Sequence, residues 1–357
     1  MKNSLICLLF FSFLFSCHTD KKVEITDVPQ VTTQPQTATT DTTTYCKDTY
    51  FNSAYKEIHA MLEGKSKPDF KRSVFLIEWA YNQGGLDYTV FCGQISNIAY
   101  DLKAFIKERG VEKYKTSGNF AIFEYFTKPH KMNNNKPYSY NFDDFYGKKD
   151  MNSIFVSGLL QTRKGQCRSM PMLYKILSDE IGAESYLAMG PNHMYIKHLD
   201  EQGKWVNIEL TNGHFSSDAW MISSLEISAE AIKKGVFMKE LTTQESISRC
   251  IEDLGTVYSR KYGYDEFALL CYDETLKYYP TSITALMGKY NVLRTQGLAY
   301  MKKNGKGRTE WLVNHHNKFK EVSDKIDFLG YRDMTPEAYR QWMEDMAKEK
   351  SKLQNQN

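Results

Sequence analysis

The chain has 357 residues and carries 46 lysines and arginines against 43 aspartates and glutamates, a formal net charge of +3. These charges form no basic stripe and accompany no nucleic-acid-binding module, which excludes nucleic acid as a predicted partner. The length allows one sizeable domain and a smaller one.

The first residues have the pattern of an export signal. Lys2 supplies a positive start, and residues 5–15 form an apolar core that is too short to span a membrane permanently. The sequence Leu-Phe-Ser-Cys at 14–17 resembles the lipobox of bacterial lipoproteins. We therefore expect residues 1–17 to be a lipoprotein signal peptide, with Cys17 acylated. The protein would be lipid-anchored to a membrane of the bacterial cell envelope, facing the periplasm or the exterior. An ordinary secretory signal is the alternative.

Residues 18–44 are rich in threonine, proline and glutamine and nearly lack large apolar side chains. Such a segment cannot bury enough surface to offset the entropy lost on ordering, so we expect a flexible tether. Folded structure is expected from Tyr45 onward. Apolar residues at helical spacing predict helices around 56–62, 74–81 and 95–106, separated by glycine and proline.

A further helix is expected to end within residues 120–126, ahead of an exposed loop that begins near Pro129. Five aromatic side chains then cluster between residues 138 and 146. They could line a substrate groove, although an aromatic cluster more often belongs to a hydrophobic core.

The segment 170–181 reads as a helix with a reactive residue at its start. Its apolar side chains recur at helical spacing, Pro171 suits the first turn, and Gly182 is a plausible stop. Cys167 therefore lies where the helix dipole and the unpaired N–H groups of the first turn favour a thiolate. We expect the same N–H groups to be able to hold an oxyanion.

A β-hairpin is predicted next. Residues 194–199 and 205–210 have the composition and alternation of strands, and residues 200–203 form the turn. Within the second strand the apolar residues fall on one face and leave Glu209 on the other. The hairpin thus carries a carboxylate on its more polar face.

The register of this hairpin determines whether a histidine meets that carboxylate. If Leu199 pairs with Gly203 around a three-residue loop, paired residue numbers sum to 402 and His193 directly faces Glu209. Opposite residues in such a pair have Cβ atoms about 4.5–5.5 Å apart, close enough for a carboxylate to orient an imidazole. Cysteine, histidine and carboxylate then stand where a nucleophile, its base and an orienting group are needed.

Three motifs here resemble the transglutaminase-like superfamily, relatives of the papain-like cysteine proteases. They are Gly-x-Cys at a helix start, His-x-aromatic on a strand, and Trp-x-x-x-acid-x-Thr-Asn-Gly on the next strand. The resemblance implies an α+β fold over residues 45–240, with an antiparallel sheet packed on the catalytic helix. It also implies that Cys167 is the nucleophile, His193 its base and Glu209 the orienting acid, 16 residues after the histidine as in many bacterial members.

The sequence departs from the family pattern at the acid. Glutamate stands where aspartate is usual, so one extra methylene must be accommodated. Asn207 is the alternative orienting residue, since papain-like relatives use asparagine in that role. Gln161, six residues before Cys167, matches the place of the oxyanion glutamine in papain-like proteases, and a polar surface residue is an equally good interpretation.

Residues 241–357 are predicted to be helical. The positions from 254 to 280 resemble a tetratricopeptide repeat with one extra residue in its turn, and residues 281–297 resemble the first helix of the next unit. We expect an all-α repeat-like domain docked on the first domain, with a basic loop at 302–308 and a surface for a protein partner. Other helices are expected at 214–222, 228–235, 241–262, 311–328 and 336–350.

Five cysteines remain once Cys7 and Cys17 are set aside, and an odd number in an exported chain leaves at least one thiol unpaired. We assign that thiol to Cys167. A metal site is the competing chemistry, with four candidate ligands: Cys167, His193, His198 and His214. Strand residues five apart point to opposite faces, and no zinc motif is present, so we expect neither a metal nor a cofactor.

Two functions follow from these patterns. In the first, Cys167 attacks a peptide, protein or amide substrate, and the acyl-enzyme passes to water rather than to an amine, giving a peptidase or amidase. In the second, the site is inactive and the lipoprotein holds a peptide or glycan. The intact order of the triad favours the enzyme, whereas the glutamate exchange and the repeat-like tail favour the binding protein.

Overall fold

The computed structural model describes residues 45–144 and 146–332, together with positions 337, 341, 344, 345 and 348. The predicted signal peptide with Cys17, the tether, Phe145 and most of the predicted last helix lie outside these residues. Within the described part of the chain, no helix combines the length and apolarity needed to cross a membrane.

The N-terminal third is helical, as predicted. It contains α1 (Thr49–Leu62), α2 (Phe70–Tyr81), α3 (Tyr88–Glu108) and α4 (Ser117–Thr127). Each of the first three begins after an aspartate, and the carboxylates of Asp48, Asp69 and Asp87 accept N–H groups of the first turn. Such caps satisfy donors that the helix itself cannot, which fixes where these helices start.

A run of short elements leads from α4 to the predicted catalytic helix. These are η2 (Lys131–Asn133), β1 (Ser139–Tyr140), η3 (Met151–Ile154), α5 (Val156–Thr162) and β2 (Lys164–Gly165). β1 pairs in parallel with β2, with Tyr140 opposite Gly165. The predicted helix follows as α6 (Ser169–Ile181) and ends at Gly182, which adopts the left-handed conformation expected of a terminal glycine.

Four strands form one antiparallel sheet in the order β3 (Tyr186–Gly190), β4 (His193–Leu199), β5 (Trp205–Glu209) and β6 (His214–Ser216). The hairpin of β4 and β5 was predicted. The helix predicted at 214–222 is wrong in its first part, because residues 214–216 pair with β5 and the helix α7 (Asp218–Ser224) begins only afterwards. A three-residue strand is too short to show alternation, so its partner defines it.

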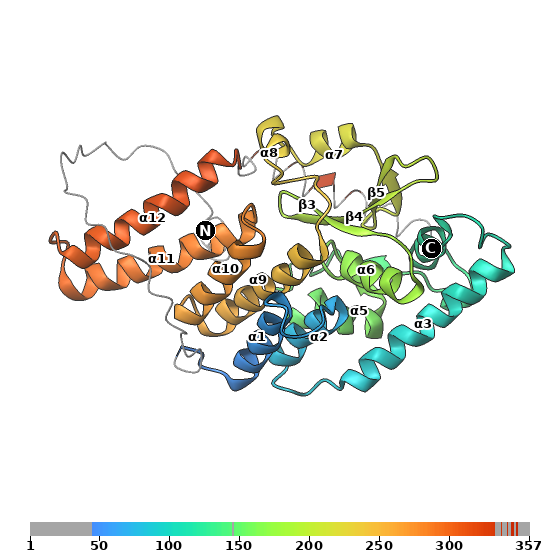
Figure 1. Ribbon diagram of the computed structural model, residues 1–357, viewed down its shortest axis with the longest axis horizontal. Helices are drawn as coiled ribbons and strands as arrows, with labels where there is room; N and C mark the ends of the chain where they lie inside the picture. Colours follow the sequence, from blue (N-terminus) through green and yellow to red (C-terminus); the bar gives the residue numbers. More distant parts are fainter. Residues whose placement is uncertain are drawn as a thin grey trace, which may run out of the picture.

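The sheet lies between two layers, with α6 on one side and α7 and α8 (Ala229–Lys233) on the other (Figure 1). Leu187, Ile196 and Ile208 share a core with α6. Ala188 and Tyr195 are neighbours of Leu187 and Ile196 in the chain and so face the opposite side of the sheet, where they pack in a second core with α7 and α8. The fold therefore mixes helices with a small sheet that is covered on both faces.

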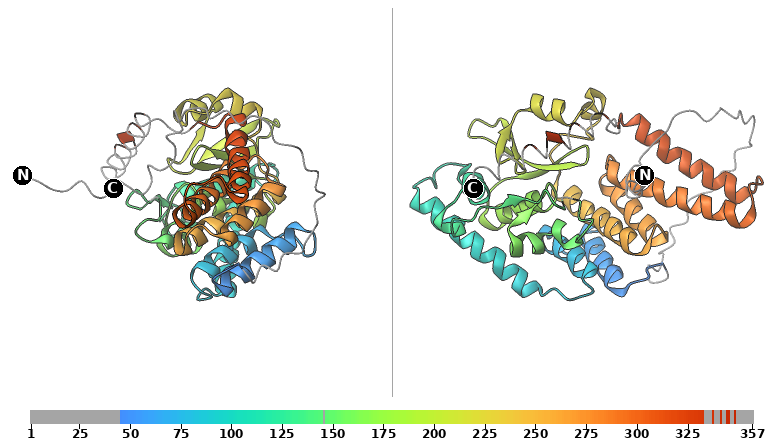
Figure 2. Two further views of the ribbon diagram at one scale, coloured as in Figure 1. Left: turned by 90° about the vertical axis from the view of Figure 1, so that its left-hand side faces the viewer. Right: turned by 180° about the vertical axis from the view of Figure 1, so that it is seen from behind.

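The C-terminal region consists of α9 (Thr243–Tyr262), α10 (Glu266–Tyr278), α11 (Ile283–Asn304) and α12 (Glu310–Phe328). α9 packs against α1 and α2, and residues of α9 and α10 share one hydrophobic core with the N-terminal helices and α6. The core is thus continuous across the predicted boundary at residue 240. Helices α11 and α12 extend from one end of the molecule (Figure 2).

Gly255 permits the close approach of α9 and α10. A Cβ atom at this position would lie 2.7 Å from Cβ of Cys271. By contrast, Gly93 is exposed in α3, and a Cβ atom there would meet nothing within 4 Å. The two helical glycines therefore differ in packing but not in secondary structure.

We predict opposite effects of alanine at these two glycines. Gly255→Ala should lower the free energy of unfolding by about 1–3 kcal/mol, because Cβ of Cys271 cannot move away from the added methyl group unless α10 shifts. Gly93→Ala should raise it by up to about 1 kcal/mol, because alanine has the higher helix propensity. Urea denaturation of both variants measures the difference, and equal effects would contradict the packing described for α9 and α10.

Candidate active site

Cys167 lies between β2 and the first turn of α6, as predicted, but the N–H groups of that turn are already occupied. Gln166 is buried, and its side-chain oxygen accepts the N–H groups of Arg168 and, at 3.3 Å, Ser169. Its backbone carbonyl accepts the N–H of Met170 at 3.1 Å. The glutamine thus caps the helix from within the same loop.

This cap overturns the prediction that the first-turn N–H groups hold an oxyanion. The next residue, Pro171, has no N–H to offer. Among the described residues, the backbone N–H of Cys167 itself donates to no protein acceptor, and it remains as an oxyanion donor. Gln161, the other predicted donor, is exposed in the last turn of α5.

His193 and Glu209 meet in a buried ion pair. Nε2 of His193 lies 2.5 Å from Oε2 of Glu209, and the two side chains are 14% and 3% exposed. The other carboxylate oxygen accepts the backbone N–H of Thr211 at 2.9 Å and its hydroxyl at 2.5 Å. Both oxygens of the carboxylate are therefore bonded, as a buried carboxylate requires.

The contact is made in a register two residues away from the predicted one. Leu199 pairs with Trp205, so paired residue numbers sum to 404, and this register extended would place His193 opposite Thr211. Glu209 is then the diagonal neighbour, for which Cβ separations are about 7–8 Å. Glutamate has one methylene more than aspartate, and this extra length lets its carboxylate reach the ring across the longer distance.

Asp200 sets the register. Its backbone N–H donates to the carbonyl of Lys204 at 2.8 Å, which closes a loop of residues 201–203. Its side chain accepts the N–H groups of Gln202 at 2.9 Å and Lys204 at 2.8 Å. An aspartate that folds the backbone this way starts the turn one position later than predicted. A slip of two residues keeps every side chain on its predicted face.

Charge and burial oppose each other in this pair, and charge prevails. Burial alone would lower the pKa of His193, but the charge of Glu209, together with hydrogen bonds to Glu209 and Cys167, raises it well above its usual value. Burial would raise the pKa of Glu209, yet the charge of His193 and the bonds from His193 and Thr211 lower it. Both shifts favour the ionised pair of imidazolium and carboxylate.

The turn between β3 and β4 places the cysteine beside the histidine. Asn192, in the left-handed conformation with φ 52°, presents its carbonyl 4.0 Å from Sγ of Cys167. The thiol is close enough to His193 to raise the pKa of the ring, as described above. Because Glu209 occupies Nε2, the other ring nitrogen, Nδ1, is left for the thiol.

Asn207 takes no part in orienting the ring. Its amide donates to the carbonyl of Ser216 at 3.1 Å and to the carboxylate of Asp218 at 2.7 Å. It therefore ties β5 to β6 and to the start of α7. The alternative prediction that Asn207 orients His193 is wrong, because the structure gives that position to Glu209.

Gln166 and Thr211 had no role in the sequence prediction, and Tyr140 entered it only as a member of the aromatic cluster at 138–146. Gln166 and Thr211 both lie in quoted motifs, but a cap and a carboxylate partner depend on side-chain conformation. Tyr140 is buried in β1, and burial, followed by the charges of Cys167 and Glu209, raises the pKa of its phenol well above the usual value. The phenol is therefore a permanently protonated group near the thiol.

Three of the other four described cysteines are chemically unlike a nucleophile. All five cysteines of the described residues are free thiols. Burial raises the pKa of Cys46 to about 11 and raises those of Cys250 and Cys271 as well, which keeps these thiols protonated. Within the same described residues, no group of three or more histidine, cysteine or acidic side chains could hold a metal ion.

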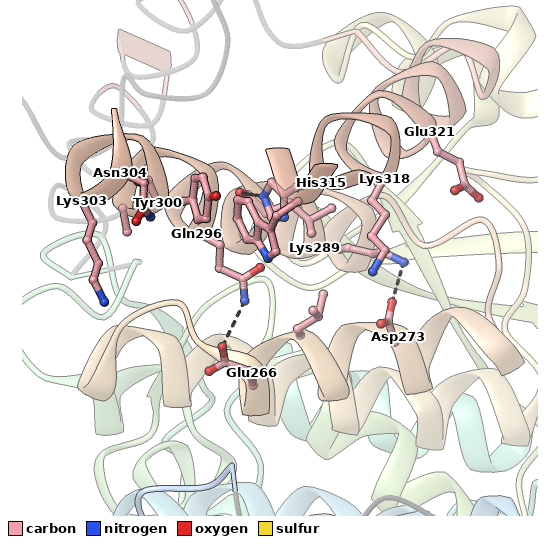
Figure 3. A pocket seen from close by; sticks show the side chains of 14 residues that line it. Glu266, Asp273, Lys289, Gln296, Tyr300, Lys303, Asn304, His315, Lys318 and Glu321 are labelled. Carbon is pink, nitrogen blue, oxygen red and sulfur yellow. Dashed lines mark hydrogen bonds and ion pairs between the residues drawn. The ribbon is translucent and has the colours of Figure 1, made fainter. Parts of the chain in front are cut away.

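A groove of about 830 Å³ lies elsewhere, between α10, α11 and α12. Trp311 stacks between Tyr300 and His315, with ring centroids 4.0 and 4.5 Å apart, along one side of it. Gln296 and Lys289 reach across to Glu266 and Asp273 (Figure 3). No residue that lines this groove belongs to the Cys167 site.

Comparison with known proteins gives no relative: no protein-family model, curated protein or solved structure matches this chain.

We predict that Glu209→Gln reverses the shift of the His193 ring. Without the carboxylate charge, burial dominates and the pKa of His193 falls below the ordinary value of about 6.5. Because the folded-state pKa of His193 is raised and that of Glu209 is lowered, the stability contributed by the pair is complete between about pH 4.5 and pH 6.5. It is lost as the pH rises through the folded-state value of His193 or falls through that of Glu209. Between these two pH values the variant should be less stable by about 3 kcal/mol, and the gap should narrow on either side.

Nuclear magnetic resonance titration of the ring and urea denaturation at several pH values measure the two effects. Glu201→Gln is the matched control, since Glu201 is an exposed acid in the loop of the same hairpin and bonds to Thr116 instead. A ring that titrates identically in wild type and Glu209→Gln would contradict the ion pair.

Proposed function

We propose that the protein is an exported, lipid-anchored thiol hydrolase, a peptidase or amidase with a transglutaminase-like core. The observation that carries this proposal is the 2.5 Å buried pair of His193 and Glu209, which leaves the second ring nitrogen beside Cys167. A raised ring pKa favours imidazolium, and imidazolium stabilises a neighbouring thiolate. The lipid anchor at Cys17 and the place in the bacterial cell envelope are part of the same proposal.

In the first half-reaction, the sulfur of Cys167, held as a thiolate by the imidazolium of His193, bonds to the carbonyl carbon of the substrate. The backbone N–H of Cys167 donates to the oxygen that becomes negative. The carbon–nitrogen bond then breaks, and His193 gives its proton to the leaving amine. The product is a thioester on Cys167 and a free amine.

In the second half-reaction, His193 takes a proton from water as the water oxygen bonds to the thioester carbon. The carbon–sulfur bond breaks, the acid leaves, and the proton stays on His193, which restores the pair of imidazolium and thiolate. Glu209 and Thr211 keep the ring in place through both steps. We propose water as the acyl acceptor because water is far more abundant than any amine.

The proposal predicts a covalent acyl-enzyme. With p-nitrophenyl acetate at neutral pH, the wild type should acquire one acetyl group on Cys167, located by mass spectrometry of its peptides. His193→Ala should slow this acylation by about 10²–10⁴-fold, the usual contribution of a positioned base. Cys92→Ala is the control, because Cys92 is a half-buried free cysteine in α3. Equal acylation of Cys92 and Cys167 would contradict the proposal.

A second function, a catalytically inactive binding lipoprotein that holds a peptide or glycan, is favoured by the groove of α10, α11 and α12. Its exposed tryptophan, Trp311, and its polar side chains of both charges are suited to a ligand or protein partner. This function predicts no acylation of Cys167 and a change of Trp311 fluorescence on binding. The acylation experiment therefore separates the two.

A further inference from the structure

The residue that follows the nucleophile is held by a helix of the C-terminal region. The guanidinium of Arg168 donates from Nη2 and Nε to Oδ2 of Asp253 at 3.0 and 3.2 Å. Its third contact is the carbonyl of Ile154, 2.7 Å from Nη1. The two charged side chains are 12% and 8% exposed, so this bond is made out of water.

Asp253 belongs to a larger set of buried charges. Its other carboxylate oxygen lies 3.4 Å from Nη2 of Arg249, which also pairs with Glu252. Glu252 in turn accepts the hydroxyl of Ser282, the residue that caps α11. Two arginines and two acids thus neutralise each other between α6, α9 and α11.

Buried ion pairs of this kind add little net stability, because desolvation of both charges offsets their attraction. Their geometric effect is specific, since two guanidinium donors on one carboxylate oxygen restrain direction as well as distance. Here they hold Arg168, whose backbone N–H is bonded to the side chain of Gln166. Cys167 lies between these two anchored residues.

We propose that Asp253 is a positioning residue for the thiol: by holding Arg168, it keeps the loop of residues 166–168 in the conformation that points Cys167 at His193. α9 then belongs to the catalytic unit rather than to a separate docked domain. The proposal rests on the proposed function, because it assumes a thiol that reacts as an ion pair with His193.

A purely electrostatic role for Asp253 predicts the opposite result. Removing a negative charge near Arg168 would leave that cation unneutralised and would stabilise the thiolate of Cys167 further. Alkylation at low pH would then become faster. Loss of positioning makes it slower, because the thiolate no longer has the imidazolium as its partner.

The test is the rate of alkylation of Cys167 by iodoacetamide in the full chain, from pH 5 to pH 9, with the modified cysteine located by mass spectrometry. In the wild type we expect reaction at pH 6, well below the pKa of about 8.5 of a free cysteine. In Asp253→Asn we expect the rate at pH 6 to fall at least about 10-fold and the rate at pH 9 to approach that of a free thiol. Asp253→Glu should recover part of the loss.

Two further variants keep the outcome interpretable. Glu57→Gln is the matched control, because Glu57 forms a forked pair with Arg72, at 2.6 and 3.0 Å, that does not touch the site. It should leave the pH profile of Cys167 unchanged. Arg168→Gln should slow the reaction as Asp253→Asn does, and the double variant should be no slower than either single one, since both act through one contact.

A folded Asp253→Asn protein with an unchanged or faster rate at pH 6 would overturn the proposal. If Asp253→Asn does not fold, judged by circular dichroism, Arg168→Lys decides the matter by the same criterion, because it keeps the positive charge and loses the two-donor contact with Asp253. If wild-type Cys167 itself reacts only as a free thiol, the proposed hydrolase function fails, and the positioning role fails with it. A reactive wild type with an insensitive variant overturns the positioning role alone.

Discussion

The buried pair of His193 and Glu209 is the interaction on which the site depends. Removing two charges from water costs several kcal/mol for each ion, and only short contacts and full hydrogen bonding offset that cost. The structure supplies both, through the 2.5 Å contact and the two bonds from Thr211 to Glu209. The sheet, covered by α6 on one face and by α7 and α8 on the other, keeps water from separating the two side chains.

The sequence predicted the contact between His193 and Glu209 correctly, but it predicted the wrong register for the pairing of β4 with β5. Hydrophobic spacing located α2, α6 and α9, because long periodic segments carry a strong signal. Alternation placed His193 and Glu209 on their proper face, and a slip of two residues preserves faces. The register error comes from the turn at Asp200. Its side chain accepts hydrogen bonds from Gln202 and Lys204, and the hydrophobic pattern of the sequence does not predict these bonds.

Other features lay beyond any pattern in one sequence. The strand β6 has only three residues, and its hydrogen bonding to β5 is what makes it a strand. The cap made by Gln166 depends on one side-chain conformation and removes the N–H groups that helix geometry alone appeared to leave for an oxyanion. The bond from Arg168 to Asp253 joins residues 85 apart, and neither residue type is unusual in its own segment.

The repeat-like sequence predicted a separate helical domain docked on the first one, whereas α9 and α10 share the main hydrophobic core. α9 packs into the main core against α1 and α2, and Gly255 brings α10 close behind it. α11 and α12 share the second core with β3 and β4 at one end, and their other ends extend beyond it (Figure 2).

The most direct measurement of the central claim is the ultraviolet absorbance of the Cys167 thiolate as a function of pH, taken as the difference between the wild type and Cys167→Ser. The account predicts thiolate absorbance already at pH 6, and its loss in His193→Ala. Absorbance that appears only near the free-thiol pKa of about 8.5, with or without His193, would contradict the ion pair and with it the hydrolase.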